Sequence, residues 1–182
     1  MNLYTIETER LLLRKLSPGD LKFVFKTYQE PEIRKILGHN TEEEYQKEKI
    51  KFEKGYTSYN RSFENFQLIN KATNVIIGHC GFHNWYFDHH RAELGYVIKQ
   101  EDFKRKGIMS EALSAIIDHG FNSMNLHRIE ALVGSENTAS LKLMKKFGFI
   151  KEGILREHYF INGKFEDSVV FSKLRSDQQK II

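Results

Sequence analysis

The stretch EDFKRKGIMSEA, residues 101–112, decides how this sequence is interpreted. Three basic residues (104–106) come directly before Gly107. Apolar residues then recur at helical spacing and predict a helix that follows Gly107 and ends near Phe121. These residues are Met109, Ala112, Leu113, Ile116 and Ile117. The first N–H groups of a helix have no partner within it and its dipole is positive at that end, so a basic glycine loop there favours an anion. The alternative is a solvated turn.

Two common phosphate-binding patterns do not account for this stretch. The Walker pattern GxxxxGK[ST] is absent, and Gly107 lacks the neighbouring glycines of the dinucleotide-binding pattern GxGxxG. The loop also follows strands that favour antiparallel pairing. The sequence therefore does not predict a nucleotide site of either kind.

Composition limits the class of protein. A chain of 182 residues with 40% hydrophobic and 29% charged residues fits one domain, residues 1–182, with a polar tail at 175–182. The 28 basic and 24 acidic residues give a net charge of +4, which is too small and too dispersed for a nucleic-acid surface. An anionic small molecule is the partner that this charge favours.

The sequence also predicts where the chain resides. Residues 1–17 contain no uninterrupted apolar run of a signal peptide, and no segment approaches the roughly 20 apolar residues of a membrane span. We therefore expect a cytoplasmic protein without a membrane partner. Cys80 is the only cysteine, which excludes an intrachain disulfide.

The first half of the chain predicts a strand and two helices, followed by three strands. Residues 9–16 form the strand, and Ser17 and Pro18 begin a helix that runs towards Glu30. The second helix begins at Thr41 with a capping box to Glu44. Three β-rich runs separated by turn signals then predict an antiparallel meander over residues 63–70, 74–85 and 91–98.

The second half alternates strands and helices. Residues 127–133 predict a strand, and residues 137–149 predict a helix with Asn137 as its N-cap and Gly148 at its end. Two final strands, residues 153–160 and 166–174, are joined by the hairpin signal INGK. The fold class is therefore α/β, with a single mixed, mostly antiparallel sheet of about seven strands flanked by about four helices.

Four motifs follow each other in the order and spacing of a known acetyl-CoA-binding core. They are AELGYVI (92–98), KRKGIMSEA (104–112), HRIEALV (127–133) and NTASLKLMKKFGF (137–149). The chain resembles the GNAT N-acetyltransferases, and ERLLLRKL (9–16) and YFINGKFEDSVVFSKL (159–174) resemble the RimJ/RimL-type branch, which acetylates N-terminal amines of ribosomal proteins. The resemblance covers about residues 6–174. It implies a GNAT fold whose sheet is splayed between the fourth and fifth predicted strands.

The resemblance implies how acetyl-CoA would be held. The pantetheine arm would run beside Tyr96, Val97 and Ile98, and Asn137 would hold the cofactor through its side-chain amide. Met109 departs from the glycine or alanine that is usual in the family at that position. The contact between the loop and the pyrophosphate at residue 109 therefore does not carry over directly from the family. The pyrophosphate would lie on the backbone amides of Lys104, Arg105, Lys106, Gly107, Ile108, Met109 and Ser110.

The chemistry requires a neutral amine, a polarised thioester and a proton for the departing thiolate. The resemblance implies that Glu93 is the general base; the alternative is that Glu93 only pairs with a cation such as Arg91. Many relatives use a tyrosine as the acid where this chain has Met144. Ser140 is then the candidate acid, unless its hydroxyl only bonds the helix start, and Tyr159 or water are the other candidates.

The acceptor is predicted from the cost of deprotonating it. An α-amine with a pKa near 8 loses its proton at neutral pH for roughly 1 kcal/mol, whereas a lysine-like amine costs about 4 kcal/mol. A protein or peptide N-terminus is therefore favoured. The predicted walls of the acceptor cleft are Trp85, Tyr86, Tyr159, Phe160 and Asn162, with simple packing as the alternative for the aromatic residues.

Other functions stay open at this level. A small amine such as a polyamine is an alternative acceptor, and a non-catalytic module that binds CoA or a partner is an alternative class. No metal is expected, because His79 and His83 lie roughly 13 Å apart along a strand, too far for one ion. A hydrolase is not predicted either, since the sequence has no GxSxG pattern. Residues 41–59 are a candidate surface for a homodimer.

Overall fold

The computed structural model describes residues 3–56 and 61–180, and these ranges form one mixed sheet with helices on both faces. The strand order is β1-β2-β3-β4-β5-β6-β8-β7, and every neighbouring pair is antiparallel except β5 and β6. The strands are β1 (Thr5–Glu7), β2 (Leu11–Leu16), β3 (Ser62–Asn70), β4 (Val75–Tyr86), β5 (Arg91–Ile98), β6 (Arg128–Gly134), β7 (Ile150–Ile161) and β8 (Lys164–Leu174).

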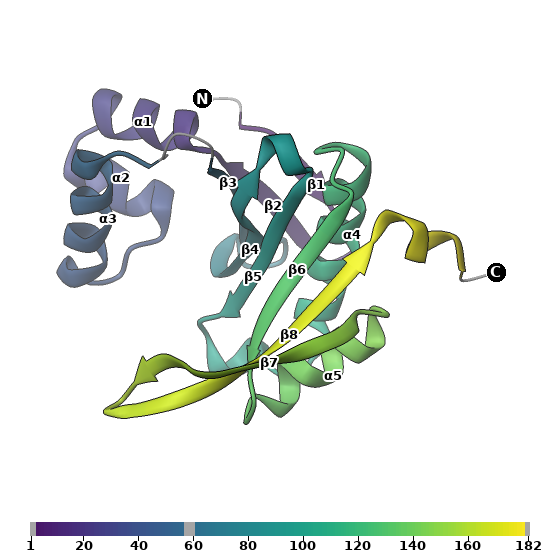
Figure 1. Ribbon diagram of the computed structural model, residues 1–182. Helices are drawn as coiled ribbons and strands as arrows, with labels where there is room; N and C mark the ends of the chain where they lie inside the picture. Colours follow the sequence, from purple (N-terminus) through teal and green to yellow (C-terminus); the bar gives the residue numbers. More distant parts are fainter. Residues whose placement is uncertain (1–2, 57–60, 181–182) are drawn as a thin grey trace.

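The helices divide between the two faces of the sheet. Figure 1 shows α1, α2 and α3 grouped on one side and α4 and α5 on the other, with the long hairpin of β7 and β8 extending away from the rest. The α-helices are α1 (Pro18–Thr27), α2 (Glu30–Leu37), α3 (Glu42–Lys54), α4 (Ile108–Asn122) and α5 (Thr138–Lys146). Short 3-10 turns are η1 (Phe87–His89), η2 (Glu101–Phe103) and η3 (Arg175–Lys180).

The predicted fold class is confirmed, with one more strand and one more helix than the sequence indicated. Strand β1 has three residues, too few to show a period in the sequence. Helix α2 is separated from α1 by a short break, where Gln29 forms a capping box with Glu32 and Pro31 lies in the first turn. The predicted helix towards Glu30 therefore stops at Thr27.

The helix caps follow the sequence, with one difference. Ser17 caps α1 in a reciprocal box with Asp20. At α3 the Thr41 hydroxyl accepts from the Glu44 N–H at 3.2 Å, but the Glu44 carboxylate accepts from the Asn40 N–H at 2.8 Å and from the Lys99 ammonium. The Glu44 side chain thus ties α3 to the sheet, and the reciprocal box predicted with Thr41 is not the contact that forms.

The only parallel pairing among the described strands is short. Strands β5 and β6 pair from Arg91 to Glu93 and from Arg128 to Glu130, and the described ladder between them ends there. Beyond Glu93, β5 continues to pair with β4 as far as Ile98. The backbone edge of β5 that faces β6 is therefore available to another partner, as the predicted splay requires.

Most of the predicted polar tail, residues 175–180, forms a short 3-10 helix in the structure. Residues up to 180 form η3, and the Arg175 guanidinium donates to the Leu126 carbonyl at 3.1 Å and to the Asn125 side-chain oxygen at 2.9 Å. Residues 181–182 of that tail lie outside the described part of the chain. Within the described ranges, no helix has both the length and the apolar character that crossing a bilayer requires.

The main core lies between the sheet and α4. Gly120 brings α4 close to the sheet, because a Cβ atom at this position would lie 2.5 Å from the Phe82 ring and 3.3 Å from the Ile129 side chain. Phe82 and Ile129 are both fully buried. The close approach of α4 therefore depends on a glycine in the middle of a helix.

We expect Gly120→Ala to lower the free energy of unfolding by about 1–3 kcal/mol, because overpacking outweighs the gain of about 1 kcal/mol in helix propensity. Gly19→Ala in α1 is the matched control, since its Cβ would meet only the Ser17 hydroxyl at 3.6 Å. The control should be neutral or stabilising. Denaturant unfolding of both variants tests this, and equal effects would contradict the packing argument.

Candidate active site

The basic loop before α4 has the backbone geometry of an anion site. Gly107 is the N-cap of α4 with φ 76°, and Arg105 also has a positive φ of 58°. The first helical bond runs from the Glu111 N–H to the Gly107 carbonyl, so the three N–H groups from Ile108 to Ser110 precede it. The Met109 side chain is buried in the core, so it points away from solvent at the start of α4.

A clamp from the start of β2 holds this loop. The Arg10 guanidinium donates to the Glu111 carboxylate at 2.6 Å and to the Lys106 carbonyl at 2.9 Å, and Glu111 also accepts from the Thr8 hydroxyl. From the other side, the Lys146 ammonium at the end of α5 donates to the Ser110 hydroxyl. Neither Arg10 nor Lys146 was predicted, because each is distant from the loop in sequence.

Beyond the loop, the predicted pantetheine strand lies along the gap between β5 and β6. Val97 is 48% exposed, whereas Tyr96 and Ile98 pack against the main core. The Tyr96 hydroxyl is enclosed, yet it makes no hydrogen bond of normal geometry to the described residues. Burial raises the pKa of the Tyr96 phenol, and the nearby Ser140 hydroxyl partly opposes this. Buried polar groups normally have a hydrogen-bond partner, and contact of the Tyr96 hydroxyl with a ligand stays a prediction.

The start of α5 faces the same gap. The Asn137 side-chain oxygen accepts from the Ser140 N–H at 3.1 Å, which makes Asn137 the predicted N-cap and leaves its amide nitrogen available to donate. Ser140 lies in the first turn, beside Tyr96. Met144, one turn further on, is fully buried. A side chain at position 144 therefore fills the core.

Glu93 lies where the pairing of β5 with β6 ends. Its carboxylate accepts from the Asn84 amide at 2.9 Å and lies 3.2 Å from the His83 ring nitrogen. The imidazole lies over Gly95, where a Cβ atom would be 3.0 Å from the ring. Arg91, the alternative partner predicted for Glu93, bonds Glu130 at 2.8 Å instead. The cation named as an example partner of Glu93 is thus engaged elsewhere, and the choice between a general base and a simple ion-pair partner stays a prediction for Glu93.

The surroundings of Glu93 keep it ionised. Burial raises the pKa of its carboxyl, but hydrogen bonds from His83 and Asn84 and the nearby His158 outweigh burial, and the net pKa is below the ordinary value. Glu93 is therefore a carboxylate throughout the neutral range. A negative charge is held at the base of the gap without a direct Lys or Arg partner among the described residues.

The five predicted acceptor walls are placed in different surroundings. Trp85 packs against the main core, and the Arg91 guanidinium lies 4.2 Å from the ring centre of Tyr86. Tyr159 is 47% exposed and its ring contacts His158, the neighbour of the Glu93 site. Their contact with a substrate stays a prediction. The remaining two are Phe160, whose ring is tilted against that of Phe165 at 4.9 Å, and Asn162, which has a positive φ in the β7–β8 turn.

Three residues of this site were missed from the sequence. His83 and Asn84 directly precede Trp85 and Tyr86, two of the predicted cleft walls, but the sequence suggested only a metal-ligand role to test for His83. Their pairing with Glu93 across β4 and β5 follows from the antiparallel register His83↔Glu93. A register estimate from the short turn between these strands could have found it. His158 reaches the site from the distant β7 and had no such signal.

The histidines of β4 stand apart from one another. His79 lies in a hollow between α3 and the sheet, where burial and the nearby Lys99 lower its pKa to about 4. Among the described residues, no three His, Cys, Asp or Glu side chains are grouped as metal ligands.

The chain matches the acetyltransferase (GNAT) domain over residues 10–150. It is 35% identical over 175 residues to the uncharacterized N-acetyltransferase p20 of Bacillus licheniformis, covering 95% of this chain and 97% of that protein. It is also 30% identical over 162 residues to a spermidine N(1)-acetyltransferase of Vibrio cholerae, covering 87% and 89%.

Solved structures give the same picture. An acetyltransferase of the GNAT family from Bacillus anthracis is 31% identical, with a TM-score of 0.66 over 95% of this chain and 99% of that chain. The ribosomal-protein-S5-alanine acetyltransferase of Vibrio fischeri is 25% identical, with a TM-score of 0.68 over 96% and 98%.

The fold and the family match define an acetyl-CoA-dependent N-acetyltransferase. The chain belongs to the GNAT acetyltransferase family. Its own residues fit the donor: the loop offers helix N–H groups beside Lys104, Arg105, Lys106 and Lys146, and the β5 edge is unpaired by β6 beyond Glu93.

We expect Gly107→Ala to weaken acetyl-CoA binding about tenfold or more, because an added methyl group blocks the approach of a phosphate to the loop. Gly163→Ala in the β7–β8 turn is the control, since both glycines have similar φ values, 76° and 79°, and no heavy atom closer than 3.6 Å to the added Cβ. Both variants should lose similar stability. Calorimetric titration with acetyl-CoA tests this, and unchanged affinity of the Gly107 variant would exclude the loop as the phosphate site.

Proposed function

We propose that this enzyme acetylates the α-amine of a protein or peptide N-terminus, in the manner of the RimJ/RimL-type branch, by direct attack of the amine on acetyl-CoA. The observation that supports this most is Glu93, an ionised carboxylate held by His83 and Asn84 at the end of the β5–β6 pairing. A site whose base has a lowered pKa is matched to an acceptor that is already partly deprotonated near neutral pH. An α-amine meets that condition better than a lysine-like amine.

Acetyl-CoA supplies the thioester that the amine attacks. The loop from Lys104 to Ser110 and the free edge of β5 bind and orient it, with Asn137 on the opposite side of the gap. These groups would fix the thioester between Glu93 on one side and Ser140 on the other. Holding the two reactants in one geometry is itself a large part of the rate enhancement.

Glu93 receives the proton that the amine loses. Its two oxygens are engaged by His83 and Asn84, which lowers its basicity but holds it in position. The nitrogen becomes strongly acidic as the new C–N bond forms, so a weak carboxylate base is sufficient. His83 contacts Glu93 and lines the hollow beside it, so its ring nitrogen offers a second route for the same proton.

Ser140 donates the proton to the departing thiolate. Its hydroxyl lies beside the enclosed Tyr96 hydroxyl, which has no other partner of normal geometry among the described residues. Tyr96 would hold the Ser140 oxygen by a hydrogen bond, and Ser140 would regain its proton from water after CoA leaves. This pair fills the role that a tyrosine at position 144 has in many relatives, whereas Tyr159 is largely exposed on the hairpin.

A polyamine is the second candidate acceptor. It is supported by the similarity to the spermidine acetyltransferase of Vibrio cholerae, whereas the N-terminal acceptor is supported by the similarity to the ribosomal-protein-S5-alanine acetyltransferase of Vibrio fischeri. A further solved relative is a dodecameric spermidine N-acetyltransferase, and self-association of this chain is part of the proposal.

We expect Glu93→Gln to lower kcat by about 10²–10⁴-fold on peptide acceptors, because the base is lost while the hydrogen-bonding shape is kept. Glu130→Gln is the matched control, since Glu130 is the register partner of Glu93 on β6 and is bonded to Arg91 and Arg128. Thiol release from acetyl-CoA measures both. A similar loss in the two variants would assign the effect to the sheet and not to the base.

The pH dependence follows from the lowered pKa of Glu93. Because the carboxylate stays ionised to below its ordinary range, only the acceptor amine must lose a proton between about pH 5.5 and 7.5. We expect log(kcat/KM) to rise with a slope near one and to level off near the pKa of the α-amine, about 8. A slope near two that returns to one in His83→Gln would show that the neutral imidazole, and not Glu93, takes the proton.

We expect Ser140→Ala to reduce kcat by about ten- to hundredfold and Tyr96→Phe by a smaller factor, with the KM for acetyl-CoA nearly unchanged. Thr138→Ala, which removes a hydroxyl from the same turn of α5, serves as the control. Acetyl thioester donors whose leaving thiol is more acidic than that of CoA should suppress the defect. Equal rates for the Ser140 and Thr138 variants would leave water as the acid.

A further inference from the structure

A groove leads along the face of the sheet covered by α3 to the Glu93 site. Its far end is a hollow of about 320 Å³ between α3 and the sheet, a size typical of ligand sites. This hollow shares Glu48, Lys51 and Phe63 with a second one, and the second shares Tyr56 and His83 with a third. The third is lined by His83 and Asn84, the two residues that hold Glu93. We call these three connected hollows the acceptor groove.

The charges of the acceptor groove are unbalanced. Its lining contains five basic and two acidic residues, so that basic residues exceed acidic ones by three, or by two when Glu93 is included. The basic residues are Lys47, Lys51, Lys54, Arg61 and Lys99, and the acidic ones are Glu44 and Glu48.

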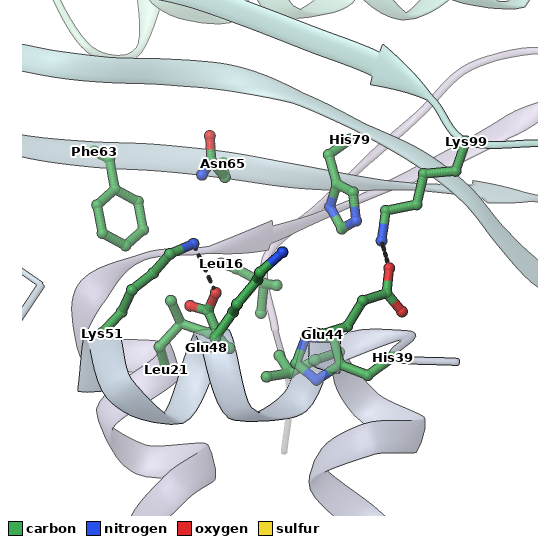
Figure 2. A pocket seen from close by; sticks show the side chains of 12 residues that line it. Leu16, Leu21, His39, Glu44, Glu48, Lys51, Phe63, Asn65, His79 and Lys99 are labelled. Carbon is green, nitrogen blue, oxygen red and sulfur yellow. Dashed lines mark hydrogen bonds and ion pairs between the residues drawn. The ribbon is translucent and has the colours of Figure 1, made fainter. Parts of the chain in front are cut away.

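Both acidic residues of the groove are already paired. Figure 2 shows Lys51 directed at Glu48 and Lys99 directed at Glu44, with ion-pair distances of 3.1 Å and 2.6 Å. The short contact with Lys99 and the Asn40 N–H lower the pKa of Glu44 to about 2. Neither carboxylate is therefore free to receive a cationic ligand without breaking an existing pair.

Two basic residues of the groove remain without an acidic partner in the described structure. No ion pair of the described residues includes Lys54 or Arg61, and the Arg61 guanidinium lies 5.8 Å from the ring centre of Tyr86. The histidines of the far hollow add no charge near neutral pH, because burial lowers the pKa of His39 and lowers that of His79 to about 4. The groove thus presents unpaired positive charge, and Glu93, held by His83 and Asn84 at its end, has no Lys or Arg partner among the described residues.

On these grounds we infer that the acceptor is an amine that also carries a carboxylate, either an N-terminal peptide with acidic side chains in its first positions or an acidic amino acid. This inference rests on the proposed function. The amine would lie at Glu93, and the carboxylate would lie towards Lys54, Arg61 and Lys51. A polycation would bring several positive charges beside these residues with only Glu93 to oppose them.

The test compares kcat/KM for acceptors that differ only in charge. The peptide amides Ala-Asp-Glu-Ala, Ala-Ser-Gln-Ala and Ala-Lys-Lys-Ala are measured beside spermidine at about 20 mM and about 300 mM salt. We expect the acidic peptide to exceed the basic peptide and spermidine by about tenfold or more at low salt, with a smaller ratio at high salt. Glutamate and its diamide separate the two sources of the carboxylate, because a free amino acid would outperform every peptide.

A charge reversal supplies the second readout. The double variant Lys54→Glu/Arg61→Glu breaks no ion pair of the described structure and should reverse the order of acidic peptide and spermidine. The control Lys35→Glu/Lys151→Glu makes the same change in net charge at exposed positions outside the groove and should leave the order unchanged.

Measuring binding and turnover separately distinguishes a failure of the inference about the acceptor from a failure of the proposed function. Titration of the same amines into the CoA complex reports on the groove even without catalysis, so tighter binding of spermidine than of the acidic peptide would overturn the inference. Thiol release that favours spermidine would overturn it as well, while leaving acetyl transfer intact. Absence of thiol release with every amine would overturn the proposed function and with it the identity of the acceptor, whereas preferential binding of the acidic peptide would still establish the charge preference of the groove.

Discussion

The point at which β5 and β6 stop pairing determines the arrangement of the site. Their parallel ladder runs over three residues on each strand and ends at Glu93 and Glu130. The chain passes from β5 through α4 to β6 and then into α5, so both helices begin near the same gap. Backbone groups on the open edge of β5 require a partner, and an extended ligand can pair with them as another strand would. One break in the sheet therefore leaves an open strand edge beside the N-termini of both helices, which is where we propose that the donor binds.

The two sides of this gap differ in their chemistry. On the side of α4 and α5 the protein offers helix N–H groups, lysines and two neighbouring hydroxyls, which suit phosphates and a thiolate. On the opposite face the protein holds one ionised carboxylate among basic residues, which suits an amine with an additional negative charge. Gly95 makes this second arrangement possible, because a larger side chain would displace the imidazole that bonds Glu93.

Much of the fold could be predicted because its signals are local. The period of the strands in residues 63–98, the caps at Ser17 and Asn137 and the glycine before α4 are all set by neighbouring residues, and each is confirmed. The errors have local causes too. Strand β1 is too short to show a period, and the break between α1 and α2 occupies only a few residues around Gln29.

The sequence alone determined the family, the glycine loop, the positions of Glu93 and Ser140 and the direction of the strands, because periodicity and motif spacing depend on chemical bonds along the chain. The tertiary structure decided which side chains meet. It paired Glu93 with His83 and Asn84 and not with Arg91, brought Arg10 and Lys146 to the loop, placed Tyr96 beside Ser140, and gathered unpaired basic residues into one groove. Such contacts join residues far apart in sequence, and their geometry depends on how strands and helices pack, which no local pattern records.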